Sequence, residues 1–219
     1  MSGRREEKKR QLRRRILEVS EGLFRQGGFD ETTVDAAVEA VGISRQTFFN
    51  YFPSKQAVLA EIGIEWLRRQ AELPRRGTRV AEARPGAVFD GVRAAIRRQL
   101  RAIEEDREFM RLVFTRSGLF FPQGAQLGSP EDEARLDHTR ALFGALGGLL
   151  KVGQKAGVIR RDLSAEQVAE IYVSVMWVTI RLWLTDYWRK PGSLVTRGMH
   201  ALDVLEAGLR ADATRRRKR

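Results

Sequence analysis

The chain has 219 residues, contains no cysteine and carries a formal net charge of +12 at pH 7. This length suits one large domain or a small domain joined to a larger one, and a hydrophobic content of 42% excludes a disordered chain. The absence of cysteine excludes disulfides, thiolate metal sites and cysteine nucleophiles. The charged start does not resemble a signal peptide, and no run of 18 uncharged apolar residues is present to span a bilayer. We therefore expect a cytoplasmic protein.

Basic residues are concentrated at the two ends of the chain. Residues 4–15 contain eight basic and two acidic side chains, and all five residues from Arg215 to Arg219 are basic. A surplus of this kind suits a polyanionic partner, either nucleic acid or an anionic membrane. For the C-terminal tail, solubility is an equally good explanation. The N-terminal cluster directly precedes the motif described below, which favours contacts with phosphate groups there.

Apolar residues recur at three- and four-residue spacing along almost the whole chain, which predicts an all-α protein. The first apolar stripe runs from Leu12 to Leu23, and Gly27 stops this helix. Thr32 and Ser44 are the expected N-caps of two short helices that follow. In chain order, the expected helices extend over about residues 12–27, 32–40, 44–52, 54–72, 86–105, 109–114, 129–157, 164–188 and 193–213.

The segment TTVDAAVEAVGISRQTFFNYFPSK, residues 32–55, has the pattern of a helix-turn-helix, although spacing alone also fits a plain αα-hairpin. Gly42 lies in the turn, where glycine easily adopts a positive φ angle. On the outward face of the second helix, arginine can bind guanine, glutamine can bind adenine, and an aromatic ring can contact a thymine methyl group. The residues expected to face inward are Val34, Ala37, Val38, Val41, Ile43, Phe48 and Phe52, and those expected to face outward are Arg45, Gln46, Phe49 and Asn50.

The longer segment ETTVDAAVEAVGISRQTFFNYFPSKQAVL resembles the helix-turn-helix signature of the TetR family of bacterial regulators. The resemblance covers about residues 12–62 and includes the paired threonines, the Gly-Ile-Ser turn and the Tyr-Phe-Pro-Ser-Lys sequence before an apolar helix. A weaker similarity, GQKAGVIRRDLSAEQVA at residues 153–169, matches the turn before the penultimate helix in many members. The resemblance implies an all-helical fold, with a three-helix DNA-binding domain followed by a ligand-binding and dimerisation domain.

The resemblance also implies roles for individual residues. Arg45 and Gln46 match the base-contacting start of the recognition helix, and Gln46 stands where a small residue is common, which indicates a distinct operator. Phe49 stands where the family usually has tyrosine, so only an apolar contact with a base is expected. Phosphate contacts are implied for Thr33, Thr47, Tyr51 and Lys55. The residues expected to bind DNA are Thr33, Ser44, Arg45, Gln46, Thr47, Phe49, Asn50, Tyr51 and Lys55.

The helix expected over residues 164–188 starts with a capping box, formed by Ser164 and Gln167, and is apolar on nearly all sides. Such a helix needs cover on two sides, one from its own core and the other from a partner, for which a second subunit is the simplest choice. The final helix adds a further apolar stripe from Leu194 to Leu209. The family resemblance implies that these two helices and their counterparts form a four-helix dimer interface; the alternative is that both are ordinary core.

Aromatic side chains are frequent after residue 60 and could together line a cavity, although each one taken singly is better explained as core. Arg181 is either a ligand anchor or one member of a salt bridge, and the salt bridge is the favoured interpretation. The glycines around Gly147 either leave room for a ligand or permit close helix packing. The residues expected to bind a ligand are Trp66, Phe89, Phe109, Phe114, Phe120, Phe121, Phe143, Trp177 and Arg181.

No catalytic residue, cofactor or metal site is expected, because the sequence contains no Gly-rich phosphate loop, metal-spaced cluster or nucleophile motif. We expect a DNA-binding domain at residues 1–55, a ligand-binding and dimerisation domain at 56–213 and a basic tail at 214–219. The expected function is that of a repressor that binds a palindromic operator in double-stranded DNA as a homodimer and is released by a mainly apolar small molecule. No membrane partner is expected. The rival is an architectural protein that coats DNA without sequence preference.

Overall fold

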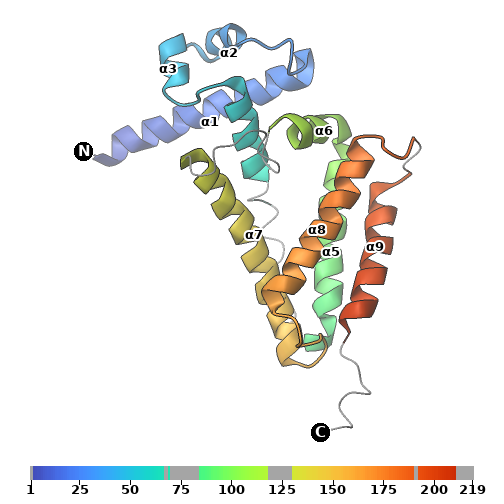
Figure 1. Ribbon diagram of the computed structural model, residues 1–219. Helices are drawn as coiled ribbons and strands as arrows, with labels where there is room; N and C mark the ends of the chain where they lie inside the picture. Colours follow the sequence, from blue (N-terminus) through green and yellow to red (C-terminus); the bar gives the residue numbers. More distant parts are fainter. Residues whose placement is uncertain (1, 67–68, 70–83, 118–129, 190–191, 211–219) are drawn as a thin grey trace, which may run out of the picture. The chain divides into compact units, whose positions relative to one another are not determined.

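The computed structural model describes residues 2–66, 69, 84–117, 130–189 and 192–210. These residues form helices joined by short connections and contain no strand, which confirms the predicted all-α fold. None of the helices within these ranges is long and apolar enough to cross a membrane. In chain order, the helices are α1 (Ser2–Gly27), α2 (Val34–Val41), α3 (Arg45–Phe49), a helix over residues 55–66, the 3-10 helix η1 (Pro85–Ala87), α5 (Val88–Glu105), α6 (Arg107–Arg116), α7 (Pro130–Lys155), α8 (Ala165–Leu184) and α9 (Leu194–Leu209), as labelled in Figure 1.

The chain forms two compact units. Residues 1–66 and 108–125 make the N-terminal unit, and residues 67–107 and 126–219 make the C-terminal unit. Helix α6 therefore has its first residue in one unit and the rest of its length in the other. The helix over residues 55–66 belongs to the N-terminal unit and so lies beyond the predicted domain boundary after residue 55. The division of functions between residues 1–55 and 56–213 stays a prediction.

The core of the N-terminal unit joins the apolar stripe of α1 to the inward faces of α2 and α3, the helix over residues 55–66 and α6. Phe48 and Phe52 face inward as predicted and are only 1% and 2% exposed. Burying a side chain of this size stabilises the fold by about 1.5–3 kcal/mol. The buried residues of this core are Ile16, Leu17, Phe24, Phe29, Ala37, Val38, Val41, Phe48, Phe52, Val58, Leu59, Ile62, Phe109 and Val113.

Hydroxyl side chains begin the two helices of the helix-turn-helix. Ser44 caps α3 as predicted, because its Oγ accepts a hydrogen bond of 3.1 Å from the backbone N–H three residues on. The N-cap of α2 is Thr33 and not, as predicted, Thr32. Thr32 is buried, and its hydroxyl donates to the carbonyl oxygen of Gly28 at 2.6 Å. Between the helices, Gly42 has a φ of 79°, the left-handed conformation that the turn was predicted to need.

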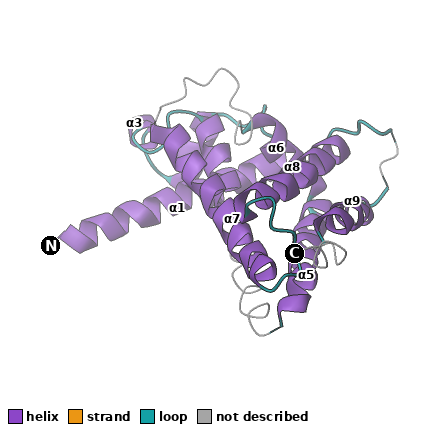
Figure 2. Ribbon diagram, turned by 60° about the horizontal axis from the view of Figure 1, so that its bottom comes forward, coloured by secondary structure: helices purple, strands orange, loops and turns teal. Residues whose placement is uncertain are grey.

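The C-terminal unit is a bundle of α5, α7, α8 and α9, in which α9 packs against α5 and α8, and α7 packs against α8 and α5 (Figures 1 and 2). Helix α9 approaches α5 closely at Gly198. A Cβ atom placed on this glycine would lie 2.1 Å from Cδ1 of Leu100, which is fully buried. Because carbon atoms in contact keep about 3.5–4.0 Å, any larger residue at this position would require the Leu100 side chain to shift.

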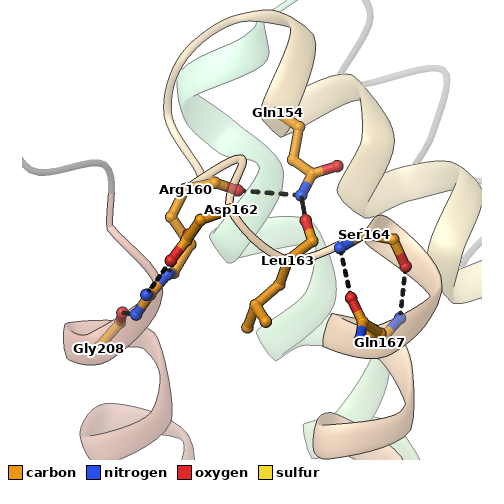
Figure 3. A network of polar contacts seen from close by, with 7 residues as sticks. All are labelled: Gln154, Arg160, Asp162, Leu163, Ser164, Gln167 and Gly208. Atoms are coloured by element: carbon orange, nitrogen blue, oxygen red, sulfur yellow. Dashed lines mark hydrogen bonds and ion pairs between the residues drawn. The ribbon is translucent and has the colours of Figure 1, made fainter.

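A network of polar contacts fixes the turn between α7 and α8 (Figure 3). The side-chain amide of Gln154 donates to the carbonyl oxygens of Arg160 and Leu163, at 2.9 and 2.8 Å. Ser164 and Gln167 form the predicted capping box at the start of α8. These bonds satisfy backbone groups that would otherwise lie unpaired between the two helices.

One buried carboxylate, that of Glu206 on α9, lies among polar partners from two other helices. Glu206 is 3% exposed and accepts hydrogen bonds from Arg93 of α5 at 3.0 Å and from the hydroxyl of Tyr172 of α8 at 3.4 Å. Burial raises the pKa of the Glu206 carboxyl, and the Arg93 guanidinium opposes that rise. The carboxylate thus ties α5, α8 and α9 together, and the removal of either partner would leave a buried polar group unpaired.

Two helices end earlier than the apolar pattern predicted. Helix α8 stops at Leu184 instead of Trp188, and Asp186 in the connection has a φ of 54° and an ion pair with Arg107. Helix α9 stops at Leu209 instead of residue 213, because the backbone N–H of Arg160 donates to the Leu209 carbonyl at 3.0 Å. Arg107 also donates from Nη2 to the carbonyl oxygen of Trp183 at 3.2 Å, so at both helix ends a group distant in the sequence bonds to a carbonyl of the last residues.

Candidate nucleic-acid interface

The outward face of α3 carries four exposed side chains in the predicted order. Arg45, Gln46, Phe49 and Asn50 are all exposed, whereas Phe48 between them is buried in the core. The exposure of Phe49, 42%, is unusual for a large apolar side chain. Because the buried Phe48 fixes the rotation of this five-residue helix, the four exposed side chains have a defined direction. The face offers one cation, two amides and an aromatic ring.

Two contacts hold the polar side chains of this face. Arg45 donates from Nη1 to the carboxylate of Asp35 on α2 at 3.2 Å, and Gln46 donates from Nε2 to Oδ1 of Asn50 at 3.1 Å. No role was predicted for Asp35, so this contact was missed from the sequence. The signal that could have found it is a lone carboxylate ten residues before the outward-facing arginine. The side chains of Arg45, Gln46 and Asn50 are exposed, so their N–H donors remain within reach of a ligand in solvent.

Of the hydroxyl groups predicted to contact phosphates, those of Thr33 and Thr47 lie close to helix starts. The Thr33 hydroxyl accepts from the backbone N–H of Ala36 at 3.1 Å, and the hydroxyls of Ser44 and Thr47 lie 2.8 Å apart. The N-terminal ends of helices favour anions, because unpaired N–H groups point outward there. Tyr51 is half-buried and packs against the core of the N-terminal unit.

Lys55 has partners other than the predicted phosphate. Its Nζ donates to three backbone carbonyl oxygens of the loop before α2, those of Phe29, Asp30 and Thr32, at 2.7, 3.0 and 3.0 Å. The ammonium also lies 4.6 Å from the centre of the Phe29 ring. An ammonium has three protons, and here all three are donated within the protein. This lysine therefore fastens the loop that presents Thr33 and the start of α2.

Comparisons with known proteins agree with this geometry. Residues 16–62, from the packed part of α1 through the helix-turn-helix to the helix over residues 55–66, match the family described as bacterial regulatory proteins, tetR family. Over nearly its whole length the chain is also similar to the crystal structure of Thermus thermophilus FadR, a TetR-family transcriptional repressor in complex with lauroyl-CoA. The two share 26% identity, with 88% of this chain and 92% of that chain covered and a TM-score of 0.67. The chain belongs to the TetR family.

Two further relatives of this TetR-family protein are named as HTH-type transcriptional regulators or repressors. An uncharacterized HTH-type transcriptional regulator of Bacillus subtilis, YdgC, is 24% identical over 191 residues, which cover 87% of this chain and 90% of the relative. The HTH-type transcriptional repressor BepR of Brucella suis is 24% identical over 204 residues, which cover 93% and 94%. The protein is a helix-turn-helix transcriptional regulator of the TetR family.

Among the described residues that were predicted to bind a ligand, three lie in the N-terminal unit, namely Trp66, Phe109 and Phe114. The rings of Trp66 and Phe114 contact each other with their centres 6.4 Å apart. Phe109 is buried in the core of the helix-turn-helix, with the guanidinium of Arg25 3.7 Å from its ring centre. Phe109 therefore lies in the packing of α6 against the helices of the N-terminal unit, a position that the sequence did not indicate.

The other residues predicted to bind a ligand lie in the C-terminal unit or outside the described ranges. Phe89 is buried, and Arg210 lies over its ring at 5.0 Å. Phe143 and Trp177 are half-buried, and Arg181 is on an exposed side of α8. The residues outside the described ranges are Phe120 and Phe121.

Proposed function

We propose that the protein is a ligand-responsive repressor that binds a palindromic operator as a homodimer, with α3 as its recognition helix. The observation that carries the proposal is the outward face of α3, where Arg45, Gln46, Phe49 and Asn50 stand exposed on a helix fixed by a buried phenylalanine. Arginine and glutamine read base edges in the major groove through paired hydrogen bonds, and an aromatic ring contacts the thymine methyl group. The carboxylate of Asp35 supports this proposed role of Arg45, because it accepts a hydrogen bond from the guanidinium and so holds it in place.

The replacement of Arg45 by alanine is expected to weaken operator binding by about 1–3 kcal/mol and to relax discrimination at one base pair of each half-site. The operator is first selected from random duplexes with the unmodified protein. Binding of the selected duplex, of its single-base variants and of unrelated DNA is then measured for both proteins at one salt concentration.

The matched control is Arg15→Ala, which removes an exposed arginine of α1. This variant is expected to lower affinity for all duplexes by the same factor, because a phosphate contact carries no sequence information. If Arg45→Ala also keeps the ratio between operator and unrelated DNA, Arg45 reads no base. If random duplexes yield no preferred sequence at all, the protein is an architectural DNA coat instead.

The exposed faces of α8 and α9 support the proposed dimer. Ile171, Val178 and Val204 are 37%, 58% and 78% exposed, although each is a large apolar side chain. Val178 also lines a hollow of about 310 Å³ between the two helices, which a second copy can fill. Burying these side chains across a two-fold axis would bury each of them twice. The residues lining the hollow are Val178, Thr179, Leu182, Trp188, Arg197 and His200.

The proposed effector is a small molecule with a long apolar part, bound within residues 56–213. The similarity that supports it is the one to Thermus thermophilus FadR, which was crystallised in complex with lauroyl-CoA. The half-buried rings of Phe143 and Trp177 offer apolar surface for such a molecule. An effector can release DNA only by its difference in affinity for the DNA-binding and the released conformations.

Lauroyl-CoA is expected to weaken operator binding by about 5–150-fold, and the operator to weaken lauroyl-CoA binding by the same factor. Calorimetric titration of the free protein and of its operator complex measures both quantities, with free coenzyme A as the control that lacks the acyl chain. The proposed acyl effector is wrong if lauroyl-CoA does not bind. Binding that leaves operator affinity unchanged would show a ligand without a regulatory role.

A further inference from the structure

The first turns of α1 form a basic helix that takes no part in the core. Every residue from Gly3 to Gln11 is exposed, and the first partly buried residue is Leu12. At 1.5 Å per residue these nine residues extend α1 by about 14 Å. Figures 1 and 2 both show these turns projecting from the N-terminal unit, past α3. We call residues 3–11 the basic extension.

The cations of α1 differ in their partners along the helix. Near the core, Arg13 forms an ion pair of 3.3 Å with Glu61 and stacks over a phenylalanine ring, and Arg14 pairs with Glu18 at 2.7 Å. In the basic extension, Arg10 pairs with Glu7, whereas the other four cations have no carboxylate within 4.0 Å among the residues that the structure describes. These four are Arg4, Arg5, Lys8 and Lys9.

We propose that the basic extension binds backbone phosphates of the duplex DNA that flanks the bases facing α3. This inference rests on the proposed function, since it needs α3 to hold the protein on DNA. Charge complementarity identifies the partner, because four unpaired cations on an exposed helix match a polyanion. With a length of about 14 Å, the extension is longer than the minor groove is wide, about 6 Å, so it is long enough to contact phosphates outside the major groove that α3 would enter. Because contacts with phosphates carry no sequence information, the extension is expected to add affinity without reading sequence.

The test replaces all four unpaired cations of the basic extension by glutamine, which keeps a good helix former at each position. On the duplex selected with the unmodified protein, binding is expected to fall by about eightfold at 0.1 M salt for each phosphate that the extension no longer binds, with a shallower salt dependence. Affinity for operator and for unrelated DNA is expected to fall by the same factor. Hydroxyl-radical footprinting is expected to show that protection disappears at the two outer ends of the site and persists at its centre.

The matched control replaces four cations of the C-terminal tail, Arg215, Arg216, Arg217 and Lys218, by glutamine, which removes the same charge from the other end of the chain. The tail variant is expected to keep the outer protection. The inference would be overturned if both variants lost the same affinity, or if the variant in the basic extension kept the footprint of the unmodified protein. In either case the extension would act only through the overall positive charge of the protein. Failure of the proposed function is distinct, because no preferred duplex would then be selected. Thermal unfolding of the variants checks that the fold is unchanged.

Discussion

A variant in which Val178 and Val204 are both replaced by glutamate is expected to be monomeric and to bind the operator at least about 100-fold more weakly than the unmodified protein. Both valines are exposed large apolar side chains, Val178 on α8 and Val204 on α9. In a two-fold interface each substitution occurs twice, so the dimer could form only if four carboxylates lost their contact with water. A monomer also lacks the gain that comes from linking two half-site contacts, about 10²–10⁴. Sedimentation at micromolar concentration and operator titration measure the two effects.

The control for this double variant is Ala94→Glu, which places a carboxylate on an exposed position of α5 in the same unit. It is expected to leave both the dimer and the affinity for the operator unchanged. The proposed interface is wrong if the unmodified protein sediments as a monomer, or if the double variant remains a dimer. Circular dichroism separates dissociation from unfolding, because exposed valines contribute little to the core of either unit.

The replacement of Lys55 by methionine is expected to destabilise the N-terminal unit by about 2 kcal/mol. Methionine keeps an apolar stem beside the Phe29 ring but removes the three hydrogen bonds from the ammonium to loop carbonyls. A hydrogen bond to a charged group contributes about 1.5–3 kcal/mol, and partial exposure of this lysine lets water replace part of that contribution. Urea denaturation measures the change in the free energy of unfolding.

The same variant distinguishes the two roles of Lys55. If the ammonium only fastens the loop, the salt dependence of DNA binding is expected to stay unchanged under conditions where the variant is folded. A phosphate contact, as the family resemblance implies, would instead make the slope shallower by about 0.9 per contact. Lys151→Met, on an exposed position of α7, is the control for the removal of one positive charge. An unchanged unfolding free energy for Lys55→Met would contradict the fastening role.

Local patterns were sufficient to predict the helices and the orientation of α3. The spacing of Phe48 and Phe52 predicted their burial, and the capping box at Ser164 and the cap at Ser44 predicted two helix starts. These features depend on residues within one or two turns, so a single sequence contains them. The choice between Thr32 and Thr33 as N-cap could not be made in this way, because it depends on which of the two hydroxyls the loop buries.

What the sequence did not predict depends on contacts between distant residues. Lys55 bonds to a loop about 25 residues earlier, and Arg107 pairs with Asp186 where α8 ends. Phe109 was expected beside a ligand, and the structure places it in the core of the N-terminal unit. There α6 packs against helices from the start of the chain, the last of which ends at residue 66. No periodicity or motif within α6 indicates that packing, so the ligand-binding set predicted from aromatic residues stays a prediction.

The close approach of α9 to α5 has a consequence for how relatives of this protein can diverge. Cδ1 of Leu100 occupies the space that a side chain at position 198 would need. A Cβ atom at position 198 therefore displaces the Leu100 side chain within the core, a cost that a smaller residue at position 100 would avoid. In an alignment, positions 100 and 198 should vary together, with alanine or serine at 198 accompanied by a smaller residue at 100.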